Sequence, residues 1–445
     1  MSRAILAPLL CVLAVCASGL MADERQDKGK KREAMDWPQF RGPNGTGIAA
    51  DAKPPLKWTD KEGVKWKTPL PGPGSSSPIV LGDRVFVTCY SGYGAEGAGT
   101  GSVEKLKRHL VCVSRTTGTV QWTADVVAVT PEDSYRGYIT EHGYASSTPA
   151  TDGEAVYVFF GKSGVLSFDL DGKKLWQTSV GTESDIRRWG SSASPILYKG
   201  LVIANAASES RSIIALDKKT GKQVWKADGK RLSLSFSTPA LVKASGGQID
   251  LVVAMPNEVW GLNPDTGKMR WLTAIDPDGN ICPAVVAGDG VAYVTGGYGT
   301  KGSLAVKVGG SGNVTKTNVL WSIGKSSYVP TPVLHANRLH NVNEDGIVIC
   351  SKADTGDVVY EKRLAVKGPG GRASRPFYAS PVLADGRLYA VSRKAGVFVF
   401  AAGDKFEQLA QNPPLDDSDF NASPAVVRRQ LFLRSNKFLY CLEAR

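Results

Sequence analysis

Ser194-Pro195-Ile196-Leu197 is one copy of the short motif that decides the fold: a small residue, then Pro, then two mostly small or aliphatic residues. The motif recurs around eight prolines, which are Pro78, Pro149, Pro195, Pro239, Pro283, Pro332, Pro381 and Pro424. Successive prolines are 71, 46, 44, 44, 49, 49 and 43 residues apart. A recurring period of this length indicates a repeat architecture.

The residues after each motif follow one order. A Gly-containing turn leads to an alternating strand, as at 386–390, and a second strand follows, as at 213–216. A Thr-Gly hairpin then precedes a last strand that a large aromatic residue opens. The residues at this position are Trp122, Trp176, Trp225, Trp271, Trp321 and, as a substitute in the sixth repeat, Tyr360. Four strands in about 45 residues make one propeller blade. We therefore predict an all-β, eight-bladed β-propeller.

Ring closure is also expected from the sequence. The eighth repeat ends at Arg445 after three strands and lacks the aromatic strand. A suitable strand, Val64-Lys65-Trp66-Lys67-Thr68, precedes the first motif. Pairing the two ends would remove both exposed sheet edges. The prediction is a propeller over residues 56–445 whose last blade is shared by the two ends.

The residues before the propeller are expected to be an address and a linker. Met1 to Arg3 give a positive start, and the apolar run 4–17 is too short to span a membrane. Residues 1–22 are therefore predicted to be a signal peptide, and residues 23–55 a linker that contains Asp36-Trp37-Pro38-Gln39-Phe40-Arg41-Gly42-Pro43. The protein would then be exported to the periplasm or cell envelope. Membrane association stays open, because Cys16 could carry a lipid.

Charge, cysteines and histidines point to no further chemistry. The net charge is +12, but the basic residues are scattered, which favours a solvated surface over nucleic-acid binding. Cys112, Cys350 and Cys441 share one repeat position and are expected to be small buried fillers. The four histidines show no zinc-site spacing, so no metal site is predicted, and His335 and His340 are expected at the surface.

The repeat, seen best from Asp217 to Trp225, resembles the pyrroloquinoline-quinone (PQQ)-like repeat family, as does the segment that begins at Asp36. That family includes quinoprotein alcohol dehydrogenases and an outer-membrane assembly propeller. In the dehydrogenases, the resemblance implies PQQ on the axis beside Ca²⁺ and a catalytic Asp, usually under a disulfide between adjacent cysteines. The sequence contains no adjacent cysteines and no Cys-x-x-Cys-His haem site. We therefore expect no catalytic residue and no cofactor, with PQQ and Ca²⁺ required only by the dehydrogenase alternative.

Long insertions predict where binding would occur. Residues 91–109, 126–146, 296–302 and 364–379 depart most from the repeat, and all should emerge on one face. Loops on a rigid scaffold are the usual place for binding. The candidate binding residues beside the channel mouth are Glu141, His142, Tyr144, Arg187, Arg188, Trp189, Phe236, Tyr328, Arg375, Tyr378 and Phe420.

Aromatic residues and arginines are typical of docking surfaces, so the main hypothesis is a non-enzymatic scaffold for a protein or peptide. The alternatives are a quinone-dependent oxidoreductase and a carbohydrate- or small-ligand-binding propeller. Alternatively, the candidate residues have no binding role and only fill the top of the channel, where they satisfy one another's hydrogen-bonding groups. His142 is expected to be a hydrogen-bonding loop residue rather than a base or a metal ligand.

Overall fold

The computed structural model describes Met1 and residues 37–95, 101–274, 279–297, 302–366 and 375–444. The predicted signal peptide beyond Met1, including Cys16, and the linker as far as residue 36 lie outside the described residues. Met35–Arg445 forms one compact unit.

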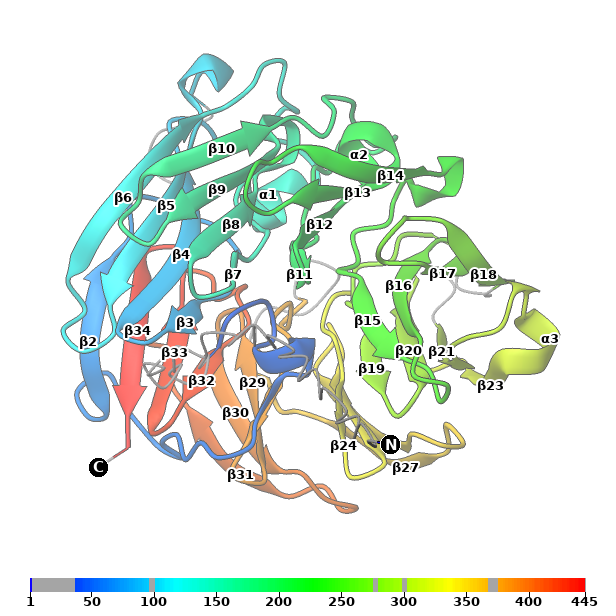
Figure 1. The fold of residues 1–445 in the computed structure, drawn as a ribbon. Helices are drawn as coiled ribbons and strands as arrows, with labels where there is room; N and C mark the ends of the chain where they lie inside the picture. Colours follow the sequence, from blue (N-terminus) through cyan, green and yellow to red (C-terminus); the bar gives the residue numbers. More distant parts are fainter. Residues whose placement is uncertain (2–36, 96–100, 275–278, 298–301, 367–374, 445) are drawn as a thin grey trace. The chain divides into compact units, whose positions relative to one another are not determined.

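This unit contains eight sheets arranged as the blades of a propeller, which confirms the predicted fold (Figure 1). Blade one contains β3 (Ile79–Leu81), β4 (Arg84–Ser91), β5 (Lys107–Ser114) and β6 (Val120–Val127), and blade two contains β7 (Ala150–Thr151), β8 (Ala155–Phe159), β9 (Val165–Asp169) and β10 (Lys174–Thr178). Blade three contains β11 (Ile196–Tyr198), β12 (Leu201–Ala206), β13 (Ser212–Asp217) and β14 (Gln223–Asp228), and blade four contains β15 (Ala240–Lys243), β16 (Ile249–Met255), β17 (Glu258–Leu262) and β18 (Met269–Ala274).

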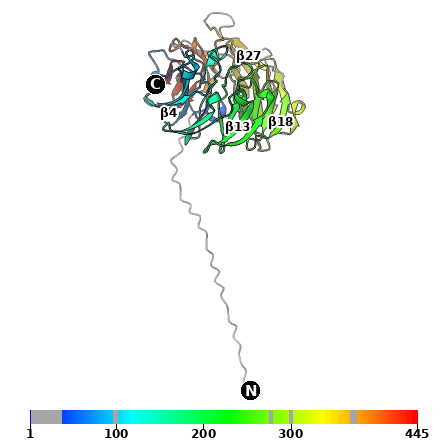
Figure 2. The same ribbon diagram turned by 90° about the horizontal axis from the view of Figure 1, so that it is seen from above.

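Blade five contains β19 (Val286–Gly288), β20 (Val291–Gly296), β21 (Gly302–Lys307) and β23 (Val319–Ile323), and blade six contains β24 (Val333–His335), β25 (Arg338–Val342), β26 (Ile347–Lys352) and β27 (Val358–Arg363). Blade seven contains β28 (Val382–Ala384), β29 (Arg387–Ser392), β30 (Gly396–Ala401) and β31 (Gln408–Asn412). Blade eight contains β32 (Ala425–Val427), β33 (Gln430–Arg434), β34 (Phe438–Glu443) and the N-terminal β2 (Val64–Pro69). Figure 2 shows the unit turned by 90°, with β13 and β18 of consecutive blades next to each other.

The helices are short and lie between strands. They are η1 (Pro43–Gly45), η2 (Val103–Lys105), α1 (Ile139–His142), η3 (Gly161–Ser163), α2 (Ala207–Ser210), η4 (Lys230–Leu232) and α3 (Thr315–Asn318). The segment between β21 and β23 also contains β22 (Gly312–Asn313), which pairs in parallel with β18 and extends the outer edge of blade four.

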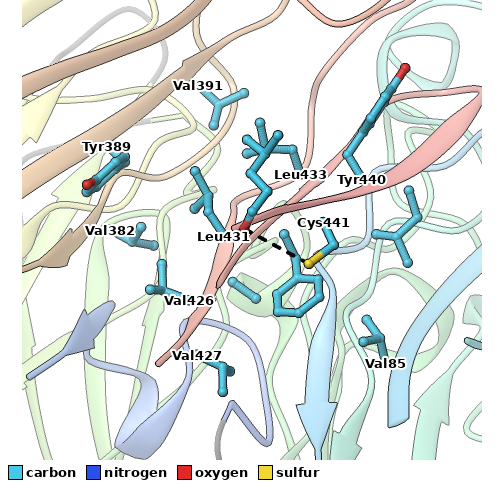
Figure 3. Packing of buried hydrophobic residues seen from close by; sticks show 14 of the residues in the cluster. Val85, Val382, Tyr389, Val391, Val426, Val427, Leu431, Leu433, Tyr440 and Cys441 are labelled. Carbon is cyan, nitrogen blue, oxygen red and sulfur yellow. Dashed lines mark hydrogen bonds between the residues drawn. The ribbon is translucent and has the colours of Figure 1, made fainter. Parts of the chain in front are cut away.

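The two ends of the propeller close the ring as the sequence predicts. β2 pairs antiparallel with β34, and Trp66 lies opposite Cys441. Apolar side chains of blades seven, eight and one pack into one cluster at this junction, where Figure 3 labels Tyr389, Leu431 and Val85. The closing strand is therefore held by a continuous core as well as by its backbone hydrogen bonds.

Most tryptophans of the outer strands are matched to the hairpin of the next blade. Trp225 Nε1 donates to the Pro264 carbonyl at 3.0 Å, and Gly267 in the same hairpin has a φ of +70°. A Cβ on Gly267 would lie 2.4 Å from the Trp225 ring, so the hairpin requires glycine for its close approach as well as its φ. Indole Nε1 atoms make the same hydrogen bond from Trp66, Trp122, Trp176 and Trp321. Trp271 departs from this pattern, because its Nε1 donates to Asp250 of its own blade at 2.7 Å. The other five tryptophans therefore join neighbouring blades.

The cysteine prediction is confirmed, and one histidine prediction is wrong. Cys112, Cys350 and Cys441 are fully buried and free. His335 is exposed, but His340 is buried on β25, because residues 339–342 of this second strand are all buried, unlike the turn that precedes them. Burial lowers the pKa of His340 to about 4, so the imidazole is neutral at ordinary pH.

The segment from Trp37 to Lys53, which the sequence assigns to a linker, packs inside the ring of blades. Figure 1 shows it in blue at the centre. Its strand β1 (Ile48–Ala49) pairs in parallel with β28, and Trp37 pairs with Val80 of blade one. Lys53 N–H donates to the carbonyl of Arg428 in blade eight at 2.6 Å. The backbone groups of this segment therefore complete inner strand edges that the repeats alone leave open.

Candidate functional site

The described parts of the long loops gather on one face of the propeller, whereas residues 96–100, 298–301 and 367–374 of the predicted insertions lie outside the described residues. One class joins the outer strand of a blade to the inner strand of the next, and the other joins the second and third strands within a blade. Loops of the two classes bond to each other: Gly229 N–H donates to the Arg211 carbonyl at 3.0 Å, and Leu364 N–H donates to the Gly346 carbonyl at 2.8 Å. We call the surface formed by both classes the loop face.

A pocket opens on this face at the propeller axis. Its cavity volume is about 150 Å³, and its floor includes Phe40 from the N-terminal segment. Five aromatic side chains, which we call the aromatic collar, also line it: Tyr138, Trp189, Phe236, Tyr328 and Tyr378. The N-terminal segment therefore contributes to the wall of the axial pocket, and the collar makes the pocket largely apolar.

The residues before the eight motif prolines line the same pocket, namely Ser77, Thr148, Ser194, Thr238, Cys282, Thr331, Ser380 and Ser423. Six of their hydroxyls each accept a backbone N–H from the preceding blade, at 2.8–3.0 Å. We call these six the hydroxyl ring: Thr148, Ser194, Thr238, Thr331, Ser380 and Ser423. The position before the motif proline therefore favours Ser or Thr over other small residues, because their hydroxyl forms a hydrogen bond between blades.

The predicted site residues divide by location. Those that line the axial pocket are Glu141, His142, Trp189, Phe236, Tyr328 and Tyr378. Arg375 lies beside it, with its guanidinium 4.8 Å from the Tyr328 ring centroid and an Nη1 hydrogen bond to the Tyr138 hydroxyl. Arg187 and Arg188 are exposed on the loop face.

Two predicted residues do not face the pocket. Tyr144 is buried against Tyr90, and its hydroxyl donates to the Asp133 carbonyl at 2.6 Å. Phe420 is buried against Tyr440 in the blade-eight core. Phe236 and Tyr328 are also buried, so the expected exposed ring of aromatics is largely a packed collar. The large side chains pack on one another because the blades converge there.

Sequence analysis missed Phe40, Tyr138 and the six hydroxyls of the ring. Phe40 was assigned to a linker, and Tyr138 belongs to an insertion without a repeat equivalent. The hydroxyls did carry a signal, because Ser or Thr precedes the motif proline in seven of the eight copies, and only Cys282 departs.

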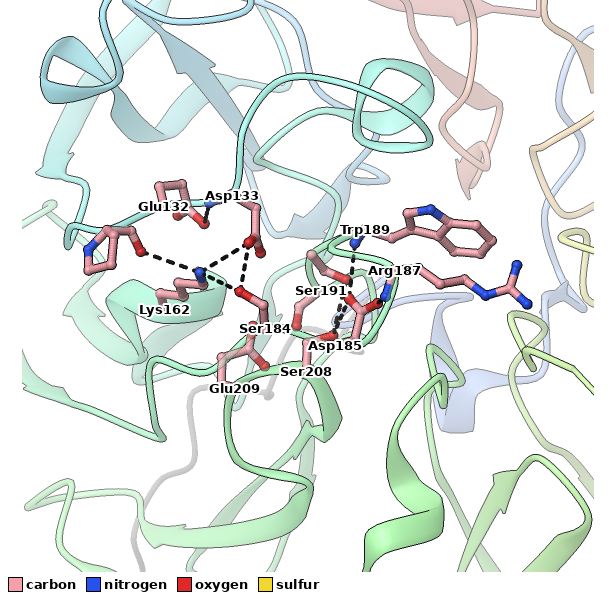
Figure 4. Close-up of polar contacts among 12 residues, drawn as sticks. Glu132, Asp133, Lys162, Ser184, Asp185, Arg187, Trp189, Ser191, Ser208 and Glu209 are labelled. Atoms are coloured by element: carbon pink, nitrogen blue, oxygen red, sulfur yellow. Dashed lines mark hydrogen bonds and ion pairs between the residues drawn. The ribbon is translucent and has the colours of Figure 1, made fainter.

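A buried aspartate shapes the exposed part of the loop face. Asp185 accepts the backbone N–H of Arg187 at 2.8 Å and of Trp189 at 3.0 Å (Figure 4). Ser208 also donates to the Asp185 carboxylate, at 3.3 Å. The Arg187 guanidinium then lies 4.9 Å from the Trp189 ring. This arrangement holds a cation and an indole together at the pocket mouth.

A buried polar cluster lies behind that turn. Lys162 pairs with Asp133 at 3.3 Å and donates to Ser184, which itself donates to Asp133 at 2.6 Å (Figure 4). Glu209 accepts from Ser191 at 2.5 Å, and its other carboxylate oxygen has no partner among the described residues. Burial raises the pKa of Glu209 to about 7. The support of the loop face is therefore sensitive to pH near neutrality.

The pocket contains a possible general base, His142, and a possible nucleophile, Cys282. Both side chains are neutral. Burial lowers the pKa of His142 to about 4, and its ring bonds to Ser146 at 2.6 Å and to the Trp189 carbonyl at 2.9 Å. The Trp189 carbonyl can only accept, so His142 carries its proton on Nε2. Burial raises the pKa of Cys282 to about 12, which keeps the thiol protonated. The His142 ring therefore serves to link two loops, through its hydrogen bonds to Ser146 and to the Trp189 carbonyl.

Known proteins share the repeat architecture described above. The family profile described as "Outer membrane protein assembly factor BamB" matches residues 56–190 and 107–362. The chain belongs to this BamB family. The match covers more than half of the 445 residues, and with the eight blades it places the chain among the PQQ-like propellers.

Individual relatives of this BamB-family chain are distant. It is 24% identical to a polyvinylalcohol dehydrogenase from a Pseudomonas species, over 53% of this chain and 39% of that protein. It is 27% identical to the outer membrane protein assembly factor BamB of Burkholderia pseudomallei strain K96243, over 45% of this chain and 42% of that protein. The matches therefore span less than half the length of either relative.

Solved structures agree in fold. The crystal structure of BamB from Moraxella catarrhalis has a TM-score of 0.55 at 12% identity and covers 85% of this chain and 98% of its own. A europium-containing methanol dehydrogenase has a TM-score of 0.58 at 10% identity and covers 92% of this chain and 98% of its own. At these identities the likeness concerns the propeller alone.

The axial pocket differs in size and chemistry from what the quinone of the dehydrogenases needs. A cavity of about 150 Å³ is the size that accommodates one aromatic ring, whereas PQQ has three fused rings and three carboxylates. Ca²⁺ prefers six to eight oxygen ligands, including carboxylates. The described residues contain no group of three His, Cys, Asp or Glu side chains suited to a metal. Glu141, the carboxylate in the lining, is paired with Arg393 at 2.9 Å. The residues described here do not fit PQQ with Ca²⁺.

Within the described part of the chain, no helix has the length and apolar character needed to cross a membrane.

Proposed function

We propose that this BamB-family chain is an exported, periplasmic or envelope-located scaffold that binds a protein or extended peptide through its loop face and uses no cofactor. The observation that carries the proposal is the turn at Asp185. It presents Ile186, which is 82% exposed, beside the exposed Arg187 and Arg188. An exposed aliphatic residue between buried aromatic packing and arginines is a composition that favours protein contacts.

Rigidity of the turn supports the same proposal. Asp185 fixes two backbone N–H groups of the turn, and Trp189 packs on Phe236 with ring centroids 5.9 Å apart. A side chain held in place before binding loses less entropy on association. The name of the Burkholderia relative, an outer membrane protein assembly factor, also favours a protein partner for this chain.

A carbohydrate site receives less support. Sugar binding of the stacking type needs a free aromatic face. Trp189, the half-buried indole of the collar, already contacts the Tyr138 ring at 4.4 Å and the Arg187 guanidinium at 4.9 Å.

The second candidate function is a quinone-dependent oxidoreductase, which the polyvinylalcohol dehydrogenase relative favours. Adding PQQ and Ca²⁺ to the purified protein separates the two candidates. The scaffold proposal expects neither saturable quinone absorbance nor reduction of an electron-acceptor dye with alcohols. Stoichiometric quinone binding with dye turnover would replace the scaffold proposal by the dehydrogenase.

A second experiment tests the loop face itself. The triple substitution Arg187→Ala, Arg188→Ala and Trp189→Ala is compared with Lys218→Ala, Lys219→Ala and Lys222→Ala, which alters the blade-three hairpin on the other face. The proteins captured from an envelope extract of the native cell are quantified. The proposal expects loss of specific partners with the first triple variant alone. Equal partner lists for both variants and the unmodified protein would exclude this patch as the interface.

A further inference from the structure

The hydroxyl ring has hydrogen-bonding capacity that the fold does not use. Each of its six hydroxyls accepts one backbone N–H, and among the described residues none of them has an acceptor for its own proton. All six are at least nine-tenths buried and line the axial pocket. A buried O–H without an acceptor is costly, so these protons favour an acceptor group on the axis.

Two buried arginines add positive potential at the level of the ring. Arg41 is 1% exposed and donates to the carbonyls of Thr331 at 3.0 Å and Pro332 at 2.6 Å. Arg434 is 1% exposed and donates to Ser76 O at 2.9 Å and Ser76 Oγ at 2.7 Å. Neither guanidinium pairs with a carboxylate among the described residues. Both therefore contribute uncompensated positive charge next to residues that line the pocket.

Carboxylates near the pocket lie beside arginines. The buried Glu344 accepts the Tyr328 N–H at 2.8 Å, and at Cys282 its charge is opposed by that of Arg375. Glu141 pairs with Arg393, which also pairs with Asp419 at 2.9 Å. The axis is consequently a place where hydroxyl donors converge and to which the buried Arg41 and Arg434 add positive charge. An anionic acceptor gains most from such a setting, because hydrogen bonds to a charged group are stronger than neutral ones.

The size and the apolar lining of the axial pocket restrict the kind of molecule that can bring an anionic acceptor into it. The cavity of about 150 Å³ has room for one ring-sized group. Phe40 forms its floor and the aromatic collar its mouth. Aromatic rings pack favourably against such surfaces.

We infer that the axial pocket binds a single-ring aromatic carboxylate, with the ring inside the aromatic collar and the carboxylate on the hydroxyl ring. Two sources have this chemistry: a free aromatic acid and the C-terminal aromatic residue of a peptide. The inference goes beyond the proposed function, because that function concerns the exposed turn at Asp185.

The test is calorimetric titration of the purified full chain with N-acetyl-L-phenylalanine and, as its matched neutral probe, N-acetyl-L-phenylalaninamide. The acid is expected to bind with 1:1 stoichiometry and at least about tenfold more tightly than the amide, as expected for a charge-assisted hydrogen bond. Sodium acetate measures any contribution from the carboxylate alone. Equal affinities for acid and amide, or no binding of the acid at millimolar concentration, would overturn the inference.

Substitutions locate the binding. Ser192 lines the pocket, and Ser192→Phe is expected to abolish binding of the acid without lowering the melting temperature. Ser245→Phe, in an exposed turn of blade four, is the control and should bind normally. Ser380→Ala should weaken acid binding more than amide binding. Unchanged acid binding in Ser192→Phe would place the ligand elsewhere and overturn the assignment.

The source is decided with Ala-Ala-Ala-Phe, used with a free and with an amidated C-terminus. Tighter binding of the free-ended peptide than of N-acetyl-L-phenylalanine indicates a peptide terminus, and binding of the small acid alone indicates a free metabolite. Loss of acid binding in all these titrations would leave the loop-face experiments unaffected. Failure of the loop-face variants would likewise leave the pocket result standing.

Discussion

The backbone N–H of Ser194 donates a hydrogen bond of 2.9 Å to Oγ1 of Thr238, the equivalent residue of the next blade. The hydroxyls before six of the eight motif prolines therefore join neighbouring blades around the axis. Thr238→Val keeps the shape of the side chain but leaves this buried N–H without its acceptor. We expect a loss of about 1–3 kcal/mol in the free energy of unfolding, measured in urea. Thr238→Ser is the control and should lose less, and equal stabilities for the Val and Ser variants would contradict this role.

The hairpin glycines should be nearly irreplaceable where they meet an indole. Gly267→Ala adds a Cβ 2.4 Å from the Trp225 ring at a φ of +70°. The strain and the clash together should cost about 2–4 kcal/mol of unfolding free energy. Gly246→Ala is the matched control in the same blade, because a Cβ there meets nothing within 4 Å. Similar melting temperatures for the two variants would show that the hairpin and the indole are not in close contact.

Glu209 should make stability depend on pH. Its pKa rises from 4.5 to about 7 in the folded protein because of burial. The folded state then binds the proton more tightly than the unfolded state, so this contribution is present below pH 4.5 and is lost as pH rises through 7. The loss is at most about 3 kcal/mol. Unfolding in urea at pH 5 and pH 8 should show a smaller difference for Glu209→Gln than for the unmodified protein.

The control for that measurement is Glu154→Gln, which changes an exposed carboxylate. It should retain the pH profile of the unmodified protein. The same profile in Glu209→Gln would assign the pH dependence to other groups.

Closure of the ring gives a prediction about the C-terminus. Removing residues 437–445 deletes β34, which pairs with both β2 and β33. We expect loss of the cooperative thermal transition, because blades one and seven then lose their shared packing against blade eight. Removing residues 444 and 445 alone should leave the transition in place. A truncation at 436 that melts cooperatively near the original temperature would contradict the closure.

The parts of the fold that the sequence could predict are those that the repeat dictates. Eight motif copies and one displaced Trp66 strand sufficed for the blade number and for the closure, because each blade needs four strands and a matched neighbour. The repeat says nothing of segments that occur once. Phe40 and Arg41 belong to such a segment, and their place on the axis depends on contacts with distant blades.

The candidate site was predictable in location and less so in exposure. Insertions at fixed places in the repeat predicted the loop face and its aromatic residues. Tyr144 of an insertion and Phe420 of the loop before blade eight both turn into packed clusters, because these loops fold onto the blades, which no local pattern encodes. For the hydroxyl ring, the repeat identified the residues themselves. Their hydrogen-bonding role was not predictable, because it depends on the geometry between blades.

Site-specific photo-crosslinking in the native cell tests the central claim, binding through the loop face, most directly. A photoreactive phenylalanine analogue replaces Ile186 on the loop face in one strain and Lys219 on the opposite hairpin in another, and adducts are resolved by mass. The account predicts discrete protein or peptide adducts from position 186 and none of these from position 219. Adducts from position 219 alone, or the same adducts from both positions, would contradict it.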